Sequence, residues 1–213
     1  SVVAGGTSAV AETPSSPPPS SSRSSSGASL KVLHWNVHHG GIGTDGKYDP
    51  GRVAAWIAKI NPHVASLNEV DTSAQVAAIV NALRAKTGAT WYLAFSGRGN
   101  LVISRVKMED VSKCLYAPSY DVYAAHGSIV FNGRRINLWS GHMHVSSASS
   151  RLSEAKALQK CAANWSEARI IAGDYNMQYG STEYKAAATN YTDAWLAAKA
   201  AGATANYSGD CDG

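Results

Sequence analysis

From Leu30 onward, the chain alternates strand patterns with helix patterns before it changes character. Segments 30–37 and 64–67 are rich in branched apolar residues, which predicts buried strands. Apolar residues recur every three or four positions in 50–60 and 73–86, which predicts helices that bury one face. The first part of the chain therefore reads strand, helix, strand, helix.

The second part is dominated by strands. Strand-like segments cover 90–95, 100–104, 110–116, 128–131 and 135–140. Between the last two, Asn132-Gly133 is a two-residue turn typical of a β-hairpin. Further along, the pattern predicts a helix over 149–165, a strand over 169–172 and helices over 181–188 and 192–200. The length of 213 residues suffices for one large domain with a sizeable core.

The most informative turn follows the strand at 169–172. Gly173 allows a sharp turn, and Asp174 and Asn176 then lie just beyond the carboxyl end of the strand. Ligands collect at this edge in sheets that are covered by helices. A carboxylate beside an amide suits a hydrolytic site, because one can orient water and the other can donate to an oxyanion. Ordinary turn chemistry explains a Gly-Asp-x-Asn sequence equally well at this point.

Similar polar residues follow the other strands. In chain order they are Asn36, Glu69, the pair Gly99-Asn100, His142, Asp174 and Asn176. This ordered set resembles the endonuclease/exonuclease/phosphatase superfamily of metal-dependent phosphoesterases, over about residues 30–213. The resemblance implies an α/β fold: a four-layer sandwich of two mixed sheets packed face to face, with helices outside.

The resemblance also implies a metal site. Glu69 is expected to bind Mg²⁺, or Mn²⁺ in its place, with Asn36 and Asp174 as further ligands. Capping of the following helix is the alternative role for Glu69. Asn68 stands where the family more usually has glutamine, so the support behind Glu69 is expected to differ. His38 could line the mouth of the site with its neighbour His39, or both could be ordinary loop residues.

The implied reaction is in-line attack of water on a phosphoester. His142, Asp174 and Asn176 are the expected catalytic residues, with Asp174 orienting water and His142 stabilising the departing group. Asn36, Asn100, His142 and Asn176 are expected to bind the phosphate of the substrate. The preferred prediction is a nuclease-like phosphodiesterase, and the alternative is a sphingomyelinase or an inositol-phosphate phosphatase. A binding or surface module that keeps the fold without turnover is the alternative of another class.

Two family motifs are absent from the sequence. The Arg-Ile-Asp and Ser-Asp-His motifs, which supply the histidine that activates water and its aspartate, do not occur in the 213 residues. Asp210-Cys211-Asp212-Gly213 does not match either of them. We therefore expect a domain at 30–213 that lacks its last strands, and a chain that is nearly inactive and unstable on its own.

Residues 1–29 differ from the rest in composition. The tract 14–26 consists almost entirely of proline and serine, which predicts a disordered linker. Such linkers join modules of secreted proteins or tether domains to cell surfaces, so we expect a secreted or surface-attached monomer with another module or tether before it. No apolar run reaches the roughly 20 residues needed to span a bilayer.

Charge and cysteine content set weaker limits. The net charge of +4 permits a nucleic-acid substrate without arguing for one. The three cysteines lack metal-ligand spacing and allow one disulfide. Structural burial is the expected role of Cys114 and Cys161.

Overall fold

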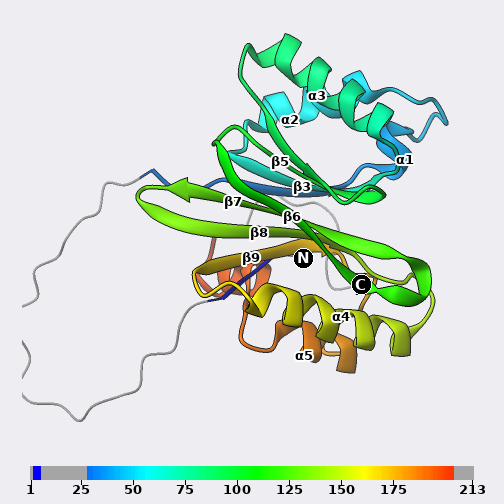
Figure 1. Ribbon diagram of the computed structural model, residues 1–213, viewed down its shortest axis with the longest axis vertical. Coiled ribbons are helices and arrows are strands. Elements are labelled where there is room, and N and C mark those ends of the chain that lie inside the picture. Colours follow the sequence, from blue (N-terminus) through cyan, green and yellow to red (C-terminus); the bar gives the residue numbers. More distant parts are fainter. Residues whose placement is uncertain (1, 6–27, 204–213) are drawn as a thin grey trace, which may run out of the picture.

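The computed structural model describes residues 2–5 and 28–203, with the backbone alone for 2–5. Its elements in chain order are β1 (Val2–Gly5), β2 (Val32–Asn36), α1 (His38–Gly41), α2 (Pro50–Ile60), β3 (Val64–Val70), α3 (Ser73–Thr87), β4 (Tyr92–Phe95), β5 (Gly99–Ser104), β6 (Met108–Ala117), the 3-10 turn η1 (Pro118–Tyr120), β7 (Val122–Phe131), β8 (Arg134–His142), α4 (Ala148–Ala163), β9 (Ala168–Asp174), α5 (Thr182–Ala188), β10 (Thr192–Asp193) and α6 (Ala194–Ala200). They stack in four layers, with α2 and α3 at one end and α4 and α5 at the other (Figure 1).

Both sheets are mixed. The smaller has the order β2-β3-β5-β4, in which only β2 and β3 run parallel. The larger has the order β10-β1-β9-β8-β7-β6, in which only β8 and β9 run parallel. The predicted four-layer α/β sandwich is therefore confirmed. Within the described residues, β2 is an edge strand of the smaller sheet.

Local sequence explains where the helices begin and end. The Asp49 side chain accepts a hydrogen bond from the backbone N–H of Arg52, and Pro50 occupies the first turn of α2. Thr72 and Gln75 form a reciprocal capping box at the start of α3. Gly88 ends that helix at φ 64°, a left-handed conformation that glycine adopts without strain.

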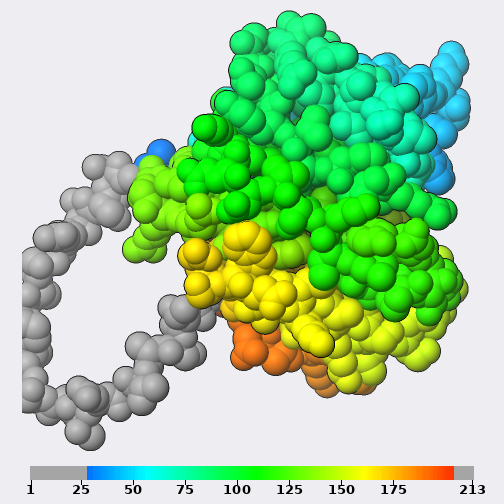
Figure 2. All heavy atoms as spheres, in the orientation of Figure 1, coloured from blue at the N-terminus to red at the C-terminus, as the bar shows by residue number. Residues whose placement is uncertain are grey.

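Alternation along the strands separates three apolar cores. Leu67 and Leu101 lie under α2 and α3, whereas Trp139 and Ile171 lie under α4. Between the sheets, a third core is built around Ile129, with Val64, Ala94, Val102, Met108, Ala125 and Leu138. The space-filling view shows the layers in contact across this face of the molecule (Figure 2). Central strands such as β3 and β5 thus bury both of their faces, one against helices and one against the other sheet, whereas much of β6 is exposed.

Three expectations about secondary structure were wrong in part. Residues 2–5 form β1, which pairs with β9 and β10, rather than belonging to a linker; the rest of the predicted linker, 6–27, lies outside the described residues. Strand β7 begins at Val122, six residues before the predicted strand, because pairing with β6 and β8 extends it. The predicted helix over 192–200 begins only after β10.

A disulfide joins Cys114 of β6 to Cys161 of α4. The two cysteines predicted to be structural therefore form a covalent link between the larger sheet and the helix that covers it. No helix of the described part of the chain is long and apolar enough to cross a membrane.

Candidate active site

Four strands deliver polar residues to one edge of the sandwich. Asn36 ends β2 and is in register with Asn68 on the parallel strand β3. His142 ends β8 and is in register with Asp174 on the parallel strand β9. Because the two sheets pack face to face, these four strand ends meet, and the edge collects groups from both sheets.

Asn36 links the two carboxylates that were predicted to bind metal. Its Nδ2 donates to Glu69 Oε1 at 2.7 Å and to Asp174 Oδ2 at 3.0 Å. Its Oδ1 accepts from the backbone N–H of His38 at 3.1 Å. The structure therefore brings together the three predicted metal ligands, and both carboxylates face one electropositive group. The two carboxylates offer oxygen ligands that fit a hard divalent cation, whereas Asn36 turns its Nδ2 toward them and its Oδ1 toward His38.

The backbone directs Glu69 out of its sheet. A register shift between Asn68 and Val70 breaks the pairing of β3 with β5, and Glu69 sits in the irregular position with φ 60°. A left-handed conformation is strained for glutamate, and such strain is characteristic of functional positions. The bulge explains why Glu69 lies at the edge while its neighbours remain in the core.

Asn68 holds the site together from behind. Its side chain is fully buried, and its Oδ1 accepts from the backbone N–H of Asp174 at 2.7 Å. Its Nδ2 donates to Asn100 Oδ1 at 2.7 Å. The sequence singled out Asn68 only as a departure from the family pattern. The structure makes it the residue that fixes β9, from the other sheet, beside Glu69.

Asn100 lies at the predicted edge, but its side chain is already occupied by other residues of the protein. Its side chain is fully buried, accepts from Asn68 and donates through Nδ2 to the backbone oxygen of Tyr123 at 2.9 Å. Asn100 lines the smaller cavity, and its side-chain partners also give it a role in positioning Asn68. The predicted direct contact of Asn100 with the substrate phosphate is therefore not supported.

His142 faces Asp174 across the two parallel strands. His142 Nε2 lies 3.9 Å from Asp174 Oδ2. Tyr116 fixes the backbone of His142 from both sides, because its hydroxyl donates to the His142 oxygen and accepts from the His142 N–H at 2.9 Å. Burial raises the pKa of Tyr116 well above its usual range, so it stays a neutral hydroxyl that can do both.

Asp174 is held in its ionised form. Burial acts to raise its pKa, but hydrogen bonds from the Asn36 side chain and the Asn176 backbone, together with the nearby His142 and His34, outweigh burial, so the pKa lies below its usual value. The Asn176 N–H donates to Asp174 Oδ1 at 3.2 Å. Asn176 Nδ2 donates to the Met143 oxygen at 3.0 Å, so its amide also closes the turn onto β8.

Two cavities flank this cluster. One of about 320 Å³ is lined by residues that include Glu69, His142 and Arg98. The other, of about 430 Å³, is lined by residues that include Asn36 and Asp174. A substrate in either cavity would lie against the predicted metal ligands.

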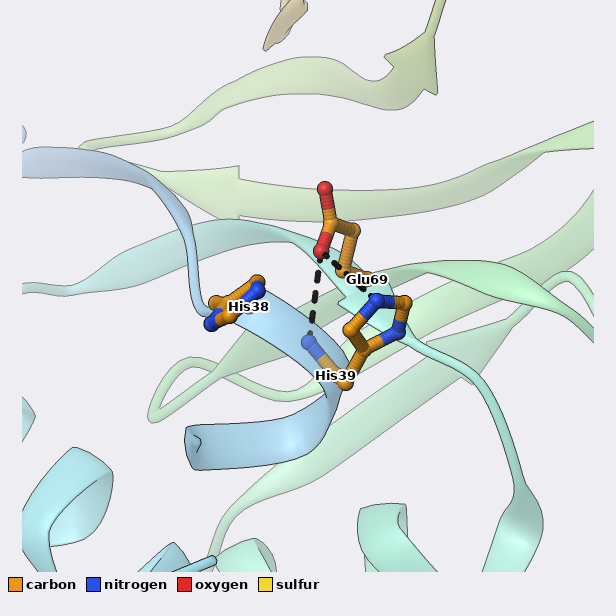
Figure 3. Close-up of side chains that lie close together, drawn as sticks. All are labelled: His38, His39 and Glu69. Carbon is orange, nitrogen blue, oxygen red and sulfur yellow. Dashed lines mark hydrogen bonds and ion pairs between the residues drawn. The ribbon is translucent and has the colours of Figure 1, made fainter. Parts of the chain in front are cut away.

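The histidines that follow β2 are close to Glu69. The backbone N–H of His39 donates to Glu69 Oε2 at 3.3 Å, and His39 Nε2 lies 4.0 Å from the same oxygen (Figure 3). His39 Nδ1 lies 2.8 Å from Asp71 Oδ2, and this hydrogen bond raises the pKa of His39. His39 also lines the smaller cavity, so for His39 the structure favours the mouth of the site over an ordinary loop role.

Comparison with known proteins agrees with this geometry. The sequence profile of the endonuclease/exonuclease/phosphatase family matches residues 33–211. No curated protein matches the chain in sequence. An endonuclease/exonuclease/phosphatase family protein from Leptotrichia buccalis superposes with a TM-score of 0.61 at 19% identity, covering 76% of this chain and 74% of the other.

Two further solved structures share the fold. The mannosyl-6-phosphatase of Bacteroides thetaiotaomicron superposes with a TM-score of 0.61 at 13% identity, covering 76% of this chain and 70% of the other. A β-hairpin deletion mutant of beta toxin from Staphylococcus aureus has a TM-score of 0.58 at 15% identity, with coverage of 76% and 72%. At these identities the likeness concerns the fold.

Proposed function

Because the chain belongs to the endonuclease/exonuclease/phosphatase family, we propose that its site hydrolyses a phosphoester with the help of a divalent cation, Mg²⁺ or Mn²⁺. One observation carries the proposal: Asn36 Nδ2 donates to both Glu69 and Asp174, which come from different sheets. Two carboxylates that converge on one donor are arranged for a cation, since their like charges would otherwise repel each other.

Each residue has a role that follows from its position. Glu69 and Asp174 would hold the cation through their carboxylates. Asn36 would join them through Oδ1, which requires its amide to turn, because its Nδ2 donates to both carboxylates. When bound, the cation would supply charge neutralisation at the phosphate. His142 can donate from its imidazole to a phosphate oxygen or to the departing oxygen, with Asp174 3.9 Å behind it to orient the ring. Asn176 is placed beside Asp174 to donate the second hydrogen of its amide.

Water is proposed to attack in line with the departing oxygen. The family motifs that supply the activating histidine do not occur in these 213 residues, so we expect very slow turnover by this chain. Binding of the cation is therefore a sharper first readout than product formation.

Among substrates, a nucleic-acid phosphodiester leads. The presence of Arg98 in the smaller cavity supports an anionic substrate, and the net charge of +4 is compatible with one. A lipid phosphodiester such as sphingomyelin, or a sugar or inositol phosphate, is the second candidate. The fold shared with a mannosyl-6-phosphatase supports a sugar phosphate as substrate.

The Cys114–Cys161 disulfide supports a location outside the cytoplasm, because disulfides persist in oxidising compartments. We propose a secreted or cell-surface monomer that the proline- and serine-rich segment connects to a further module or tether.

The test combines cation binding with hydrolysis in the full 213-residue chain. Mn²⁺ binding, followed by electron paramagnetic resonance, is expected to weaken at least about 100-fold in Glu69→Gln, because a charged ligand is lost. Glu109→Gln is the matched control, since Glu109 pairs with Arg135 on the surface away from the site. Its Mn²⁺ affinity should stay within twofold of the wild type.

Long incubations with plasmid DNA, sphingomyelin and inositol phosphates, with and without Mg²⁺, then choose the substrate. Product that requires both Mg²⁺ and Glu69 supports hydrolysis. Cation binding with no product from any substrate supports the metal site and is the result that the missing motifs predict for this chain. A folded chain that binds Mn²⁺ equally well with and without Glu69 overturns the proposal.

A further inference from the structure

Two imidazoles stand beside the Glu69 carboxylate. One ligand atom from each of His38, His39 and Glu69 lies within 4.8 Å of the others, and Figure 3 shows the two rings on either side of the carboxylate. Only Glu69 of these three belongs to the set predicted for Mg²⁺. Its Oε1 is the oxygen that accepts from Asn36, whereas its Oε2 is the one that faces His39.

The hydrogen bonds of the two rings fix their tautomers. His39 Nδ1 lies 2.8 Å from the Asp71 carboxylate, and His38 Nδ1 lies 3.2 Å from the Ile42 carbonyl oxygen. Both partners can only accept when Asp71 is ionised, so in each neutral ring Nδ1 must carry the hydrogen. Nε2 is then the nitrogen with a free lone pair. Histidines that bind metals show this arrangement, with the other ring nitrogen donating to a carboxylate or a carbonyl.

The backbone also keeps the rings in place. His38 and His39 are consecutive and adopt φ 50° and φ 48°, and Glu69 adopts φ 60°. Three non-glycine residues in the left-handed region converge on one spot, a conformation that is strained for each of them. Without this conformation, adjacent residues on a strand would point to opposite sides.

We propose that His38, His39 and Glu69 Oε2 form a second cation site, one for a transition metal of the Zn²⁺ class. Two imidazoles and one carboxylate suit Zn²⁺ and its neighbours rather than Mg²⁺, which favours oxygen alone. Zinc–nitrogen bonds of about 2.0 Å require ligand atoms about 3.3 Å apart, so the widest gap has to close by up to about 1.5 Å to complete the site. The His39 side chain, 57% exposed, has room to make this movement.

The site would leave one coordination position open at the mouth of the smaller cavity. It shares Glu69 with the proposed Mg²⁺ site, but it does not depend on the proposed hydrolysis. Binding of Zn²⁺ can be measured without any substrate, so failure of one proposal does not entail failure of the other.

The test is calorimetric titration of ZnCl₂ into the metal-free 213-residue chain, with Co²⁺ absorption as a spectroscopic probe. The Cys211→Ser background is used throughout, because a third thiol outside the disulfide would itself bind zinc. We expect one equivalent of Zn²⁺ and a Co²⁺ spectrum typical of nitrogen and oxygen ligands. His38→Gln and His39→Gln should each weaken Zn²⁺ binding at least about 30-fold.

Asp71→Asn leaves all three ligands in place but removes the carboxylate behind His39, so a loss of about 10-fold or more is expected. His144→Gln is the matched control, because His144 lines the same cavity and its Nδ1 already accepts from the backbone of Ser146 and Ser147. Asp174→Asn should weaken Mn²⁺ but leave Zn²⁺ affinity within about threefold.

Absence of Zn²⁺ binding by a chain that circular dichroism shows to be folded overturns the proposal. So does Zn²⁺ binding that survives in the His38→Gln/His39→Gln double variant, or that His144→Gln removes.

Discussion

One end of the interface between the two sheets is apolar, and the other end is polar. At one end, Val64, Leu138 and Ile170 pack into an apolar core around Ile129. At the other, the same strands carry Asn68, His142 and Asp174. The residues between these ends on the inward face are Ser66 on β3, Ser140 on β8 and Ala172 on β9, and Ser66 Oγ donates to Ser140 Oγ at 2.8 Å.

The difference shows how one interface both stabilises a fold and holds a site. Apolar packing is non-directional, so it fixes the sheets together without fixing individual atoms. Buried hydrogen bonds are directional, and each lost partner leaves a desolvated group behind. The polar end therefore contributes less stability and more positional control. The predictions below separate these two contributions.

The largest expected effect on stability lies at the apolar end. Ile129→Ala removes a fully buried side chain and leaves a cavity, which should lower the free energy of unfolding by about 3 kcal/mol. Mn²⁺ affinity of the folded variant should equal that of the wild type. Urea unfolding and Mn²⁺ titration measure both. A large change in affinity would mean that the two ends are not independent.

At the polar end, a smaller loss of stability should accompany a loss of metal binding. Asn68→Ala leaves the Asp174 N–H and Asn100 Oδ1 without their partner, so we expect about 2 kcal/mol of destabilisation. Cation affinity should fall at least about 10-fold, because β9 is no longer fixed beside Glu69. Asn137→Ala is the control, since Asn137 is equally buried but contacts His126 and Glu167 elsewhere. The Asn137→Ala variant should be less stable than the wild type but should bind the cation with the same affinity.

The smallest effect concerns a polar group that is buried away from both ends. His126 is fully buried between Trp139 and Trp165, and its Nδ1 lies 2.9 Å from Ser112 Oγ. Burial lowers its pKa and outweighs the hydrogen bond to Asn137 and the charge of Asp110. The unfolded chain therefore takes up the proton first, and stability falls as pH drops below about 6.5.

One such group changes the free energy of unfolding by at most about 1.4 kcal/mol per pH unit. Urea unfolding at pH 7 and pH 5.5 should show a steeper loss for the wild type than for His126→Gln, which cannot titrate. Equal slopes would show that His126 accepts its proton in the folded state and that its hydrogen bonds adapt to the charge.

Much of the fold could be predicted from local sequence. The Asn132-Gly133 turn is present, with φ 49° and 74°, because few other residue pairs adopt two left-handed conformations in succession. The ends of α2 follow from Asp49, Pro50 and Asn61. The order of polar residues after the strands predicted which of them gather at one edge, since parallel strands bring their carboxyl ends together.

Contacts between distant segments required the tertiary structure. The hydrogen bond from the Asp174 N–H to Asn68 spans 106 residues, and no local pattern encodes it. The first half of β7, the strand at 2–5 and the pairing of Cys114 with Cys161 likewise depend on neighbours far along the chain. Periodicity reports which face of a segment is buried, but only packing of one sheet on the other decides which polar groups meet. The sequence alone predicted which polar residues gather at this edge, because they follow the strands in order. The face-to-face packing of the sheets decided that Asn68 joins Asp174 to Asn100 and that two histidines lie beside Glu69.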